Sequence, residues 1–256
     1  MLIERVEQRV LGALRLVDRV TQASLKRPLF LYSNRARLVR NARGYYVVTH
    51  ATGLEPHSAS FQRPPVAPAL ESRNYSIEIT DPLGHYLPRL LELRLPRDPD
   101  PAHAEDIGSL FRPVDVALYP AGTAPLSPNW STLRISVARV SNHAPVRGAL
   151  LQVINAADDT LLASGISDVR GEALVIVPGV PITKFADEEN EEGEGGGEPP
   201  VVVNTLPVRL EMSLGTTTPW PVNPDLLEQH HVANRRMSMD LALSTGRMER
   251  VVINVT

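Results

Sequence analysis

The amino-acid sequence predicts an all-β protein of two tandem β-sandwich domains connected by long loops that contain proline. Three observations predict this class. Apolar and polar residues alternate with a period of two in several short segments. Proline occurs 23 times, and neither helix interiors nor central strands tolerate it well. Two stretches also share a common residue order, and the length of 256 residues suits two domains that each bury a core.

The internal repeat relates residues 14–32 to residues 134–153. Placing Val17 on Val137 aligns the two stretches without a gap. The aligned pairs are Arg19 and Arg139, Val20 and Val140, Thr21 and Ser141, Arg27 and Arg147, and Leu31 and Leu151. Each copy then continues to an Arg-Gly pair, which is followed by an apolar run. We therefore expect two sandwiches that superpose, with Val17 equivalent to Val137 and Gly44 equivalent to Gly171.

Each copy is predicted to run strand, turn, strand, strand, turn, strand. In the second copy, Leu133, Ile135 and Val137 alternate with polar residues, as in a half-buried strand. The sequence SNHAP is a turn cluster, and ALLQVINA and TLLASGIS are the next strands. Residues 168–171 then form a tight turn before EALVIVP, because glycine adopts the positive φ that such turns need. Arg43-Gly44 is expected to form the corresponding turn.

The residue order of the second copy resembles the carboxypeptidase regulatory-like, or transthyretin-like, family of Ig-like β-sandwiches. The matching residues are Val137, Val140, Ser141, Pro145, Val146, Gly148, Ala149, Leu151, Val153, Ser167, Asp168, Gly171, Ala173 and Val175. The first copy departs from the pattern, with Pro28 in place of Gly148 and Asn41 near the place of Asp168. The resemblance implies a fold whose turns are defined by Gly44, Gly148, Asp168 and Gly171. It implies a structural or linking role and no catalytic residue.

The rest of the chain supplies further strands and two long excursions. Strands are expected at residues 75–80, 90–95, 113–120, 237–243 and 249–255, and short helices near residues 1–10, 102–111 and 224–234. A Pro-, Gly- and Ser-rich linker at residues 120–129 predicts domains at 1–125 and 126–256. The connections 51–74 and 97–112 are long, and loops of such length are usually functional or mobile.

Two charged segments are candidate interaction sites. The Glu- and Gly-rich tract at residues 187–200 is predicted to be an insertion at a hairpin tip of the second domain. Its Glu188, Glu189, Glu191 and Glu192 form either a solvated loop or a docking site for a basic partner. Arg35, Arg37 and Arg40 form either a solvated sheet face or a basic patch for nucleic acid or an acidic partner surface. Because the net charge is −3, we expect no nucleic-acid partner.

The sequence contains no motif for catalysis or metal binding. It has no cysteine, which excludes disulfides and thiolate metal sites. His230 and His231 are adjacent and therefore point in different directions, whereas a helical metal pair is spaced i, i+4. No G-x-S-x-G elbow or EF-hand spacing occurs, and GEGGG lacks the Lys-Ser/Thr of a phosphate loop. We expect no enzyme activity, no cofactor and no metal.

Two hypotheses for function remain. The first is a non-catalytic structural or adaptor protein of a larger assembly, such as a phage tail or a phage-tail-like contractile injection particle, with other protein subunits as partners. Strand addition by a neighbour and a homo-oligomer are both compatible with it. The second is a carbohydrate- or cell-surface-binding module that uses Trp130, Trp220, Tyr45, Tyr46 and Tyr86. Charges interrupt the apolar N-terminal segment, so we expect no classical signal peptide, no membrane insertion, and a cytoplasmic or particle-associated protein.

Overall fold

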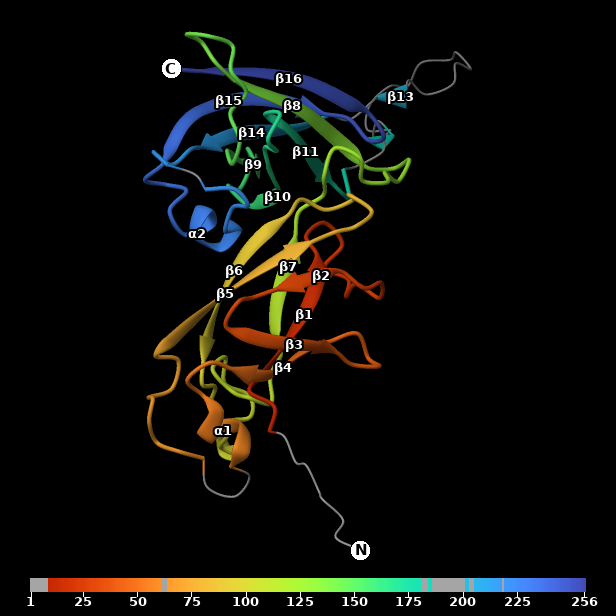
Figure 1. Ribbon diagram of the computed structural model, residues 1–256. Helices are drawn as coiled ribbons and strands as arrows, with labels where there is room; N and C mark the ends of the chain where they lie inside the picture. The colour runs from red at the N-terminus through yellow and green to blue at the C-terminus, as the bar shows by residue number, and fades with distance from the viewer. Residues whose placement is uncertain (1–8, 61–63, 181–183, 186–200, 203–204, 218) are drawn as a thin grey trace, which may run out of the picture. The chain divides into compact units, whose positions relative to one another are not determined.

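The computed structural model describes residues 9–60, 64–180, 184–185, 201–202, 205–217 and 219–256, and it is almost entirely β (Figure 1). This confirms the predicted fold class. The described helices are α1 (Glu55–Ala59), α2 (Pro224–Gln229) and a 3-10 turn at Pro101–His103. The helix expected near 102–111 is only this short turn: the Asp100 side chain accepts from the Ala102 N–H at its start, and residues 104–108 form turns and a bend. Helix α1 was not predicted, and most of the helix expected near 1–10 falls outside the described residues.

The chain divides into two compact units. Unit 1 comprises Met1–Tyr119 together with Pro219–Leu226, and unit 2 comprises Pro120–Thr218 together with Leu227–Thr256. The segment Pro219–Leu226, which lies in the predicted second domain 126–256, thus belongs to the first unit. A residue such as Val222 pairs there with strand β6, a long-range contact that leaves no local signal in the sequence.

Unit 1 consists of two sheets that enclose one core. The first sheet has the order β3 (Ala36–Arg40), β4 (Tyr46–Ala51), β1 (Gly12–Asp18), β7 (Val114–Leu118), and the second has β2 (Phe30–Tyr32), β5 (Arg73–Thr80), β6 (Arg89–Leu95). Strand β5 shows why these segments are strands. Its Tyr75, Ile77 and Ile79 are buried, and the alternate residues lie on the outer face. Each buried side chain of this kind stabilises the fold by about 1.5–3 kcal/mol.

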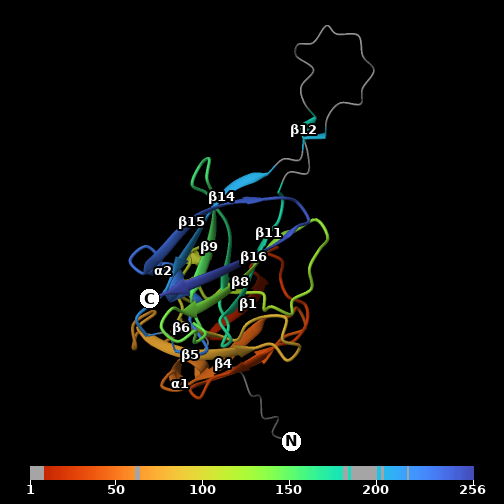
Figure 2. The same ribbon diagram turned by 90° about the horizontal axis from the view of Figure 1, so that it is seen from above.

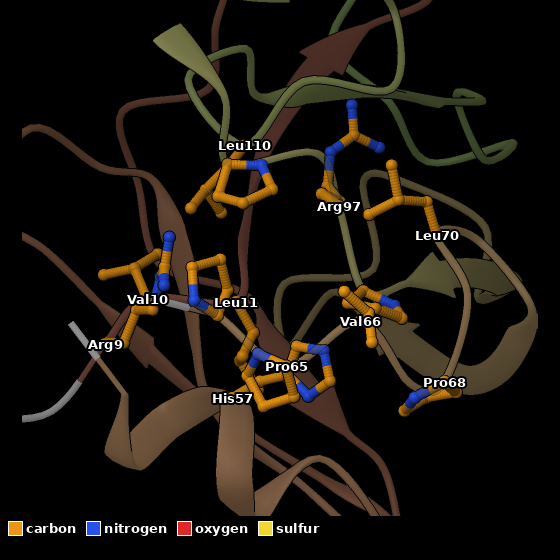
Figure 3. A pocket seen from close by; sticks show the side chains of 13 residues that line it. Arg9, Val10, Leu11, His57, Pro65, Val66, Pro68, Leu70, Arg97 and Leu110 are labelled. Carbon is orange, nitrogen blue, oxygen red and sulfur yellow. The ribbon is translucent and has the colours of Figure 1, made fainter. Parts of the chain in front are cut away.

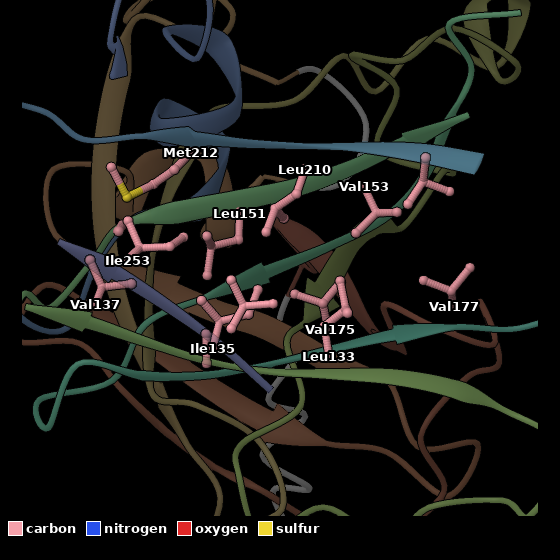
Figure 4. Packing of buried hydrophobic residues seen from close by; sticks show 14 of the residues in the cluster. Leu133, Ile135, Val137, Leu151, Val153, Val175, Val177, Leu210, Met212 and Ile253 are labelled. Carbon is pink, nitrogen blue, oxygen red and sulfur yellow. The ribbon is translucent and has the colours of Figure 1, made fainter. Parts of the chain in front are cut away.

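Unit 2 also has seven described sandwich strands, but they are divided differently between its two sheets. One sheet has the order β11 (Glu172–Val177), β8 (Ser131–Arg139), β16 (Met248–Val255). The other has β10 (Leu161–Ile166), β9 (Leu150–Asn155), β14 (Leu206–Ser213), β15 (Arg235–Leu243). Apolar side chains from both sheets meet in the core shown in Figure 4, with Leu133, Ile135, Leu151 and Leu210 fully buried.

A small ribbon of two strands comes between β11 and β14 in the chain order. Strand β12 (Lys184–Phe185) pairs with β13 (Val201–Val202). The whole of the predicted acidic insertion, residues 187–200, lies between these two strands in the sequence. Glu188, Glu189, Glu191 and Glu192 fall outside the described residues, so the hypothesis of a docking tract is still a prediction.

The two units share one turn in atomic detail. In unit 1, the Asn41 side-chain oxygen accepts from the N–H groups of Arg43 and Tyr45, and the Gly44 N–H donates to the Asn41 carbonyl. In unit 2, Asp168 accepts from Arg170 and Glu172 in the same way, and the Gly171 N–H donates to the Asp168 carbonyl. Gly44 and Gly171 both have positive φ, at 90° and 75°. The two Arg-Gly pairs therefore occupy equivalent turns.

The predicted pairing of Val17 with Val137 is wrong by one residue. The Asp18 N–H donates to the Ala23 carbonyl, and the Arg139 N–H donates to the Ala144 carbonyl in the equivalent turn. Strand β1 therefore aligns Leu16, not Val17, with Val137. By β2 and β9 the predicted pairing of Leu31 with Leu151 fits, since each faces a buried residue of the next strand, Ile79 and Met212. Unit 1 has one extra residue in the connection, which an alignment without gaps conceals.

The third strand of each unit joins a different sheet. In unit 1, β3 pairs with β4, whereas in unit 2 the corresponding β10 pairs with β9. In unit 2 the change is tied to Gly148, whose φ is 73° and whose N–H donates to the Ser167 carbonyl. The Ser167 hydroxyl also bridges the Ala149 N–H and the Val146 carbonyl, which fixes the end of β10 against the start of β9.

The two equivalent glycines should differ in their tolerance of alanine. A Cβ at Gly44 would come closest to the flexible Arg40 guanidinium, at 3.3 Å, and would meet the Leu25 carbonyl only at 3.7 Å, whereas a Cβ at Gly171 would lie 2.4 Å from the Val137 carbonyl oxygen. We expect Gly44→Ala to lower the free energy of unfolding by about 1–2 kcal/mol through its positive φ. Gly171→Ala should cost more than about 3 kcal/mol, because a backbone clash adds to that strain. Urea unfolding of the full chain, followed through the transition of the unit that carries each change, measures the two losses of stability. Equal losses for both variants would contradict this expectation.

Candidate functional site

The three arginines of the candidate basic patch have separate surroundings. The Arg35 guanidinium lies over the Tyr75 ring at 5.2 Å from its centroid. Arg40 donates to the Lys26 carbonyl, and its Nε is buried without a hydrogen-bond partner among the described residues. Arg37 is exposed on β3, which is an edge strand of its sheet. Exposed charge on an edge strand is a common protection against unwanted strand pairing.

Two of the aromatic residues considered for sugar stacking are structural. Tyr46 is buried, and its hydroxyl both accepts from the Leu29 N–H and donates to the Leu29 carbonyl. The Tyr86 hydroxyl donates to Asp18 at 2.6 Å, and the Arg27 guanidinium lies over its ring. Burial and the neighbouring Asp18 carboxylate raise the pKa of Tyr86. The Tyr46 ring is enclosed in the core, and Arg27 lies over the half-buried Tyr86 ring.

The Arg27–Asp81 pair is the centre of this buried network. Asp81 forms an ion pair with Arg27 and accepts from the N–H groups of Leu83, His85 and Tyr86. Burial alone would raise the pKa of Asp81, but the Arg27 guanidinium and the N–H donors outweigh it and lower the pKa to about 2. The Asp81 carboxylate thus stabilises the turn between β5 and β6.

This network should make stability depend on pH below about pH 4. The Asp81 pKa falls from 3.8 to about 2 on folding, so its contribution is complete above pH 4 and is lost as the pH drops toward 2. We expect Asp81→Asn to lower the free energy of unfolding at pH 7 by at least about 2 kcal/mol, and the difference from wild type to shrink toward pH 2. Thermal unfolding at several pH values measures this. Exposed Glu92→Gln removes the same charge as a control, and an equal effect of both changes would contradict the assignment.

No described residues form a recognisable metal site. No group of three or more His, Asp or Glu side chains is placed to hold an ion within the part of the chain that the structure describes. The His231 Nδ1 instead lies 2.7 Å from the Glu228 carbonyl. No helix of the described chain is both long enough and apolar enough to cross a membrane. The expected absence of metal and of catalysis is still a prediction.

A pocket in unit 1, which was not predicted as a site, is lined mainly by apolar side chains (Figure 3). It encloses about 270 Å³. Its walls come from the two long connections that the sequence marked, the first with Pro64, Pro65, Val66, Pro68 and Leu70, and the second with Pro99 and Leu110. The remaining lining residues are Arg9, Val10, Leu11, His57, Pro96 and Arg97.

The second wall is held by Arg97, at the end of β6. This side chain is 7% exposed, and its guanidinium donates to the carbonyls of Ser109, at 2.9 Å, and Ile107. Burial lowers its pKa, partly offset by Glu71 at 3.9 Å. Because Arg97 is engaged with the loop backbone, it shapes the pocket and contributes little free polarity to it.

His57 of α1 is the only titratable residue besides the two arginines among the described residues that line the pocket. It is 5% exposed, and its Nδ1 has no hydrogen-bond partner among the described residues. Burial lowers its pKa, as do the positive charges of Arg9 and Arg73, while the Pro65 carbonyl acts in the opposite direction. The imidazole is therefore neutral near pH 7, and the pocket interior is almost wholly apolar.

The rim of this pocket exposes apolar side chains to solvent. Val66 is 96% exposed, Leu70 51% and Val10 41%. Ile107 and Phe111, on the same loop as Leu110, are also exposed. Contiguous exposed apolar surface around a concave site commonly marks a contact surface for another molecule.

Comparison with known proteins gives no family. No family model matches the chain, and no curated protein matches it. The resemblance to the carboxypeptidase regulatory-like family thus depends on the turn and core residues alone.

Several solved structures are weakly similar. The Bacillus anthracis TIE protein is 8% identical with a TM-score of 0.29, and the match covers 96% of this chain and 34% of that one. A streptococcal ancillary pilin is 8% identical with a TM-score of 0.25, covering 85% of this chain and 49% of that one. GBS52, a minor pilin of Streptococcus agalactiae, is 9% identical with a TM-score of 0.28, covering 95% and 94%. This chain spans about a third and about half of the first two, and TM-scores this low support no conclusion about function.

Proposed function

We propose that this protein is a non-catalytic binding module that docks an apolar segment of a partner protein in the pocket of unit 1. The observation that carries the proposal is an apolar pocket with an exposed apolar rim, built from two long loops of the first sandwich. The volume of about 270 Å³ is below the roughly 300–1,000 Å³ of small-molecule sites. It suits one or two apolar side chains of a peptide better than a free metabolite.

The chemistry of the lining supports binding over catalysis. Five of the lining residues are prolines, which lack an N–H donor, and the two guanidinium groups donate to backbone carbonyls. A hydrolase of the triad type needs a nucleophile within hydrogen-bond reach of a base. His57 has no such partner among the described residues lining this pocket.

Changing one rim residue should abolish the interaction without unfolding the protein. We expect Val66→Asp to remove partner binding, because a carboxylate would have to be desolvated against an apolar ligand. Val252→Asp, on the outer face of β16 in unit 2 and 70% exposed, is the matched control. Methyl NMR titrations with short Leu- or Phe-centred peptides, and pulldown from the native source with each variant, measure binding. Equal behaviour of both variants, or no shift at Leu70 and Leu110, would contradict the proposal.

We place this module in a larger protein assembly, with other subunits as partners. A phage tail or phage-tail-like contractile injection particle is the assembly that fold-level analogy suggests. The accompanying cytoplasmic or particle-associated localisation belongs to the same proposal.

A second candidate function, carbohydrate binding, is favoured by one specific observation. Phe30 and Tyr32 lie on the same face of β2, each 68% exposed, and Glu78 pairs with Tyr32 on that face. Exposed rings can stack on a sugar, and a neighbouring carboxylate can accept hydrogen bonds from the sugar hydroxyls. If this face binds glycans, a glycan array should give reproducible signals that Tyr32→Ala reduces at least about tenfold. Silence of the wild-type protein would exclude it.

A further inference from the structure

Strand β15 is a long edge strand with no described partner on its outer side. It runs for nine residues, Arg235–Leu243, and ends the sheet β10-β9-β14-β15 (Figures 1 and 2). Among the described residues it pairs only with β14. An edge of this length presents a row of backbone N–H and C=O groups that another strand can bind.

The inner face of β15 is also incompletely covered. Met237, Met239 and Leu241 point toward the core but are only partly buried. The equivalent strand of unit 1 is β6, because Ile79 pairs with Arg89 as Met212 pairs with Met237. There the matching residues are buried: Arg89 is 2% exposed, Leu91 5% and Leu93 2%.

Unit 1 shows what completes such an edge. The Leu90 N–H donates to the Val222 carbonyl at 2.7 Å, and Arg89 forms a parallel bridge with Val222. Val222 thus lies beside β6 and is itself buried. No described segment does this for β15.

The outer face of β15 carries one positive and one negative side chain. Arg236, Ser238 and Asp240 are exposed and lie on the same face, with opposite charges on either side of the serine. In an antiparallel pair the residue numbers of opposed residues have a constant sum. A second β15 with Ser238 opposite Ser238 therefore places Arg236 opposite Asp240 twice, and Met237 opposite Met239 twice on the inner face.

We propose that β15 pairs antiparallel with β15 of a second copy of this chain, about a two-fold axis at Ser238. The resulting dimer joins two four-stranded sheets into one continuous sheet. The two cross-strand ion pairs set the register, since opposite charges directly across strands stabilise a pair and like charges oppose it. A shift of the axis to Arg236 or to Asp240 would bring like charges together. The proposal does not depend on the pocket of unit 1.

The absence of cysteine from the sequence allows a direct test by cross-linking. In the proposed register, the thiols introduced by Ser238→Cys in the two copies would lie on directly opposed residues, whose Cα atoms are about 4.5–5.5 Å apart, within disulfide range. Ala242→Cys, exposed on the same face, is the matched control. Its two copies would be roughly 27 Å apart along the strands. We expect oxidation to give a covalent dimer at least about tenfold faster for Ser238→Cys. Equal rates, or a faster reaction for Met239→Cys, would overturn the register.

Charge reversal tests the association without a cross-link. Arg236→Asp or Asp240→Arg alone should weaken the dimer about tenfold in sedimentation equilibrium, because each change sets like charges opposite one another twice. The double variant should restore the wild-type affinity, a result that loss of folding does not mimic. Circular dichroism and thermal unfolding confirm that each variant is folded. A wild-type protein that stays monomeric at about 100 μM, or a double variant as weak as the single ones, would overturn the proposal.

Discussion

Both units depend on one constraint: the last strand of a sandwich sheet must have its apolar inner face covered as well as its backbone paired. Strand β6 meets this requirement because Val222 lies along it and its inner residues are buried. Strand β15 has the same place in unit 2 and leaves Met237, Met239 and Leu241 partly open. Burial of apolar surface stabilises a fold by about 25 cal/mol per Å², so the partial exposure of these three side chains lowers the stability of unit 2. An added strand that covered them would recover this free energy.

The partition of strands between the sheets follows from local contacts at the turns. The Asn41 and Asp168 turns are the same in both units, so this turn does not decide which sheet the third strand joins. Ser167 does bind β10 to the start of β9 in unit 2 through its hydroxyl. In unit 1, β3 pairs with β4 through a register shift at Arg37 and Leu38. In unit 2, the Ser167 hydroxyl thus adds a contact that holds β10 beside β9.

Sequence patterns predicted what is local and periodic. Alternation located β5, β6 and β8. The Asp168–Gly171 chemistry located a turn but not a hairpin, because β10 and β11 on either side of it belong to different sheets. The one-residue error at Val17 has a clear cause, since an extra residue later in the loop restores the match at Leu31. The sequence predicted only part of the pocket. Its two walls were recognised as unusually long loops. Arg97 and buried His57 bring these loops together through contacts between residues that are distant in the sequence. The return of Val222 to β6 left no local signal for the same reason.

The charges of β15 distinguish a protected edge from a self-complementary one. Proteins that guard an edge strand usually place like charges, often lysines, along it, and these repel any incoming copy. Arg37 on β3 fits that use. On β15 the exposed face instead carries one positive and one negative residue four positions apart, with a small serine midway. In an antiparallel pair this spacing repels at the registers centred on either charge and attracts only at the register centred on Ser238. Exposed ion pairs contribute little free energy individually, so their main effect here is to select the register, while the inner-face methionines and the backbone edge provide most of the binding.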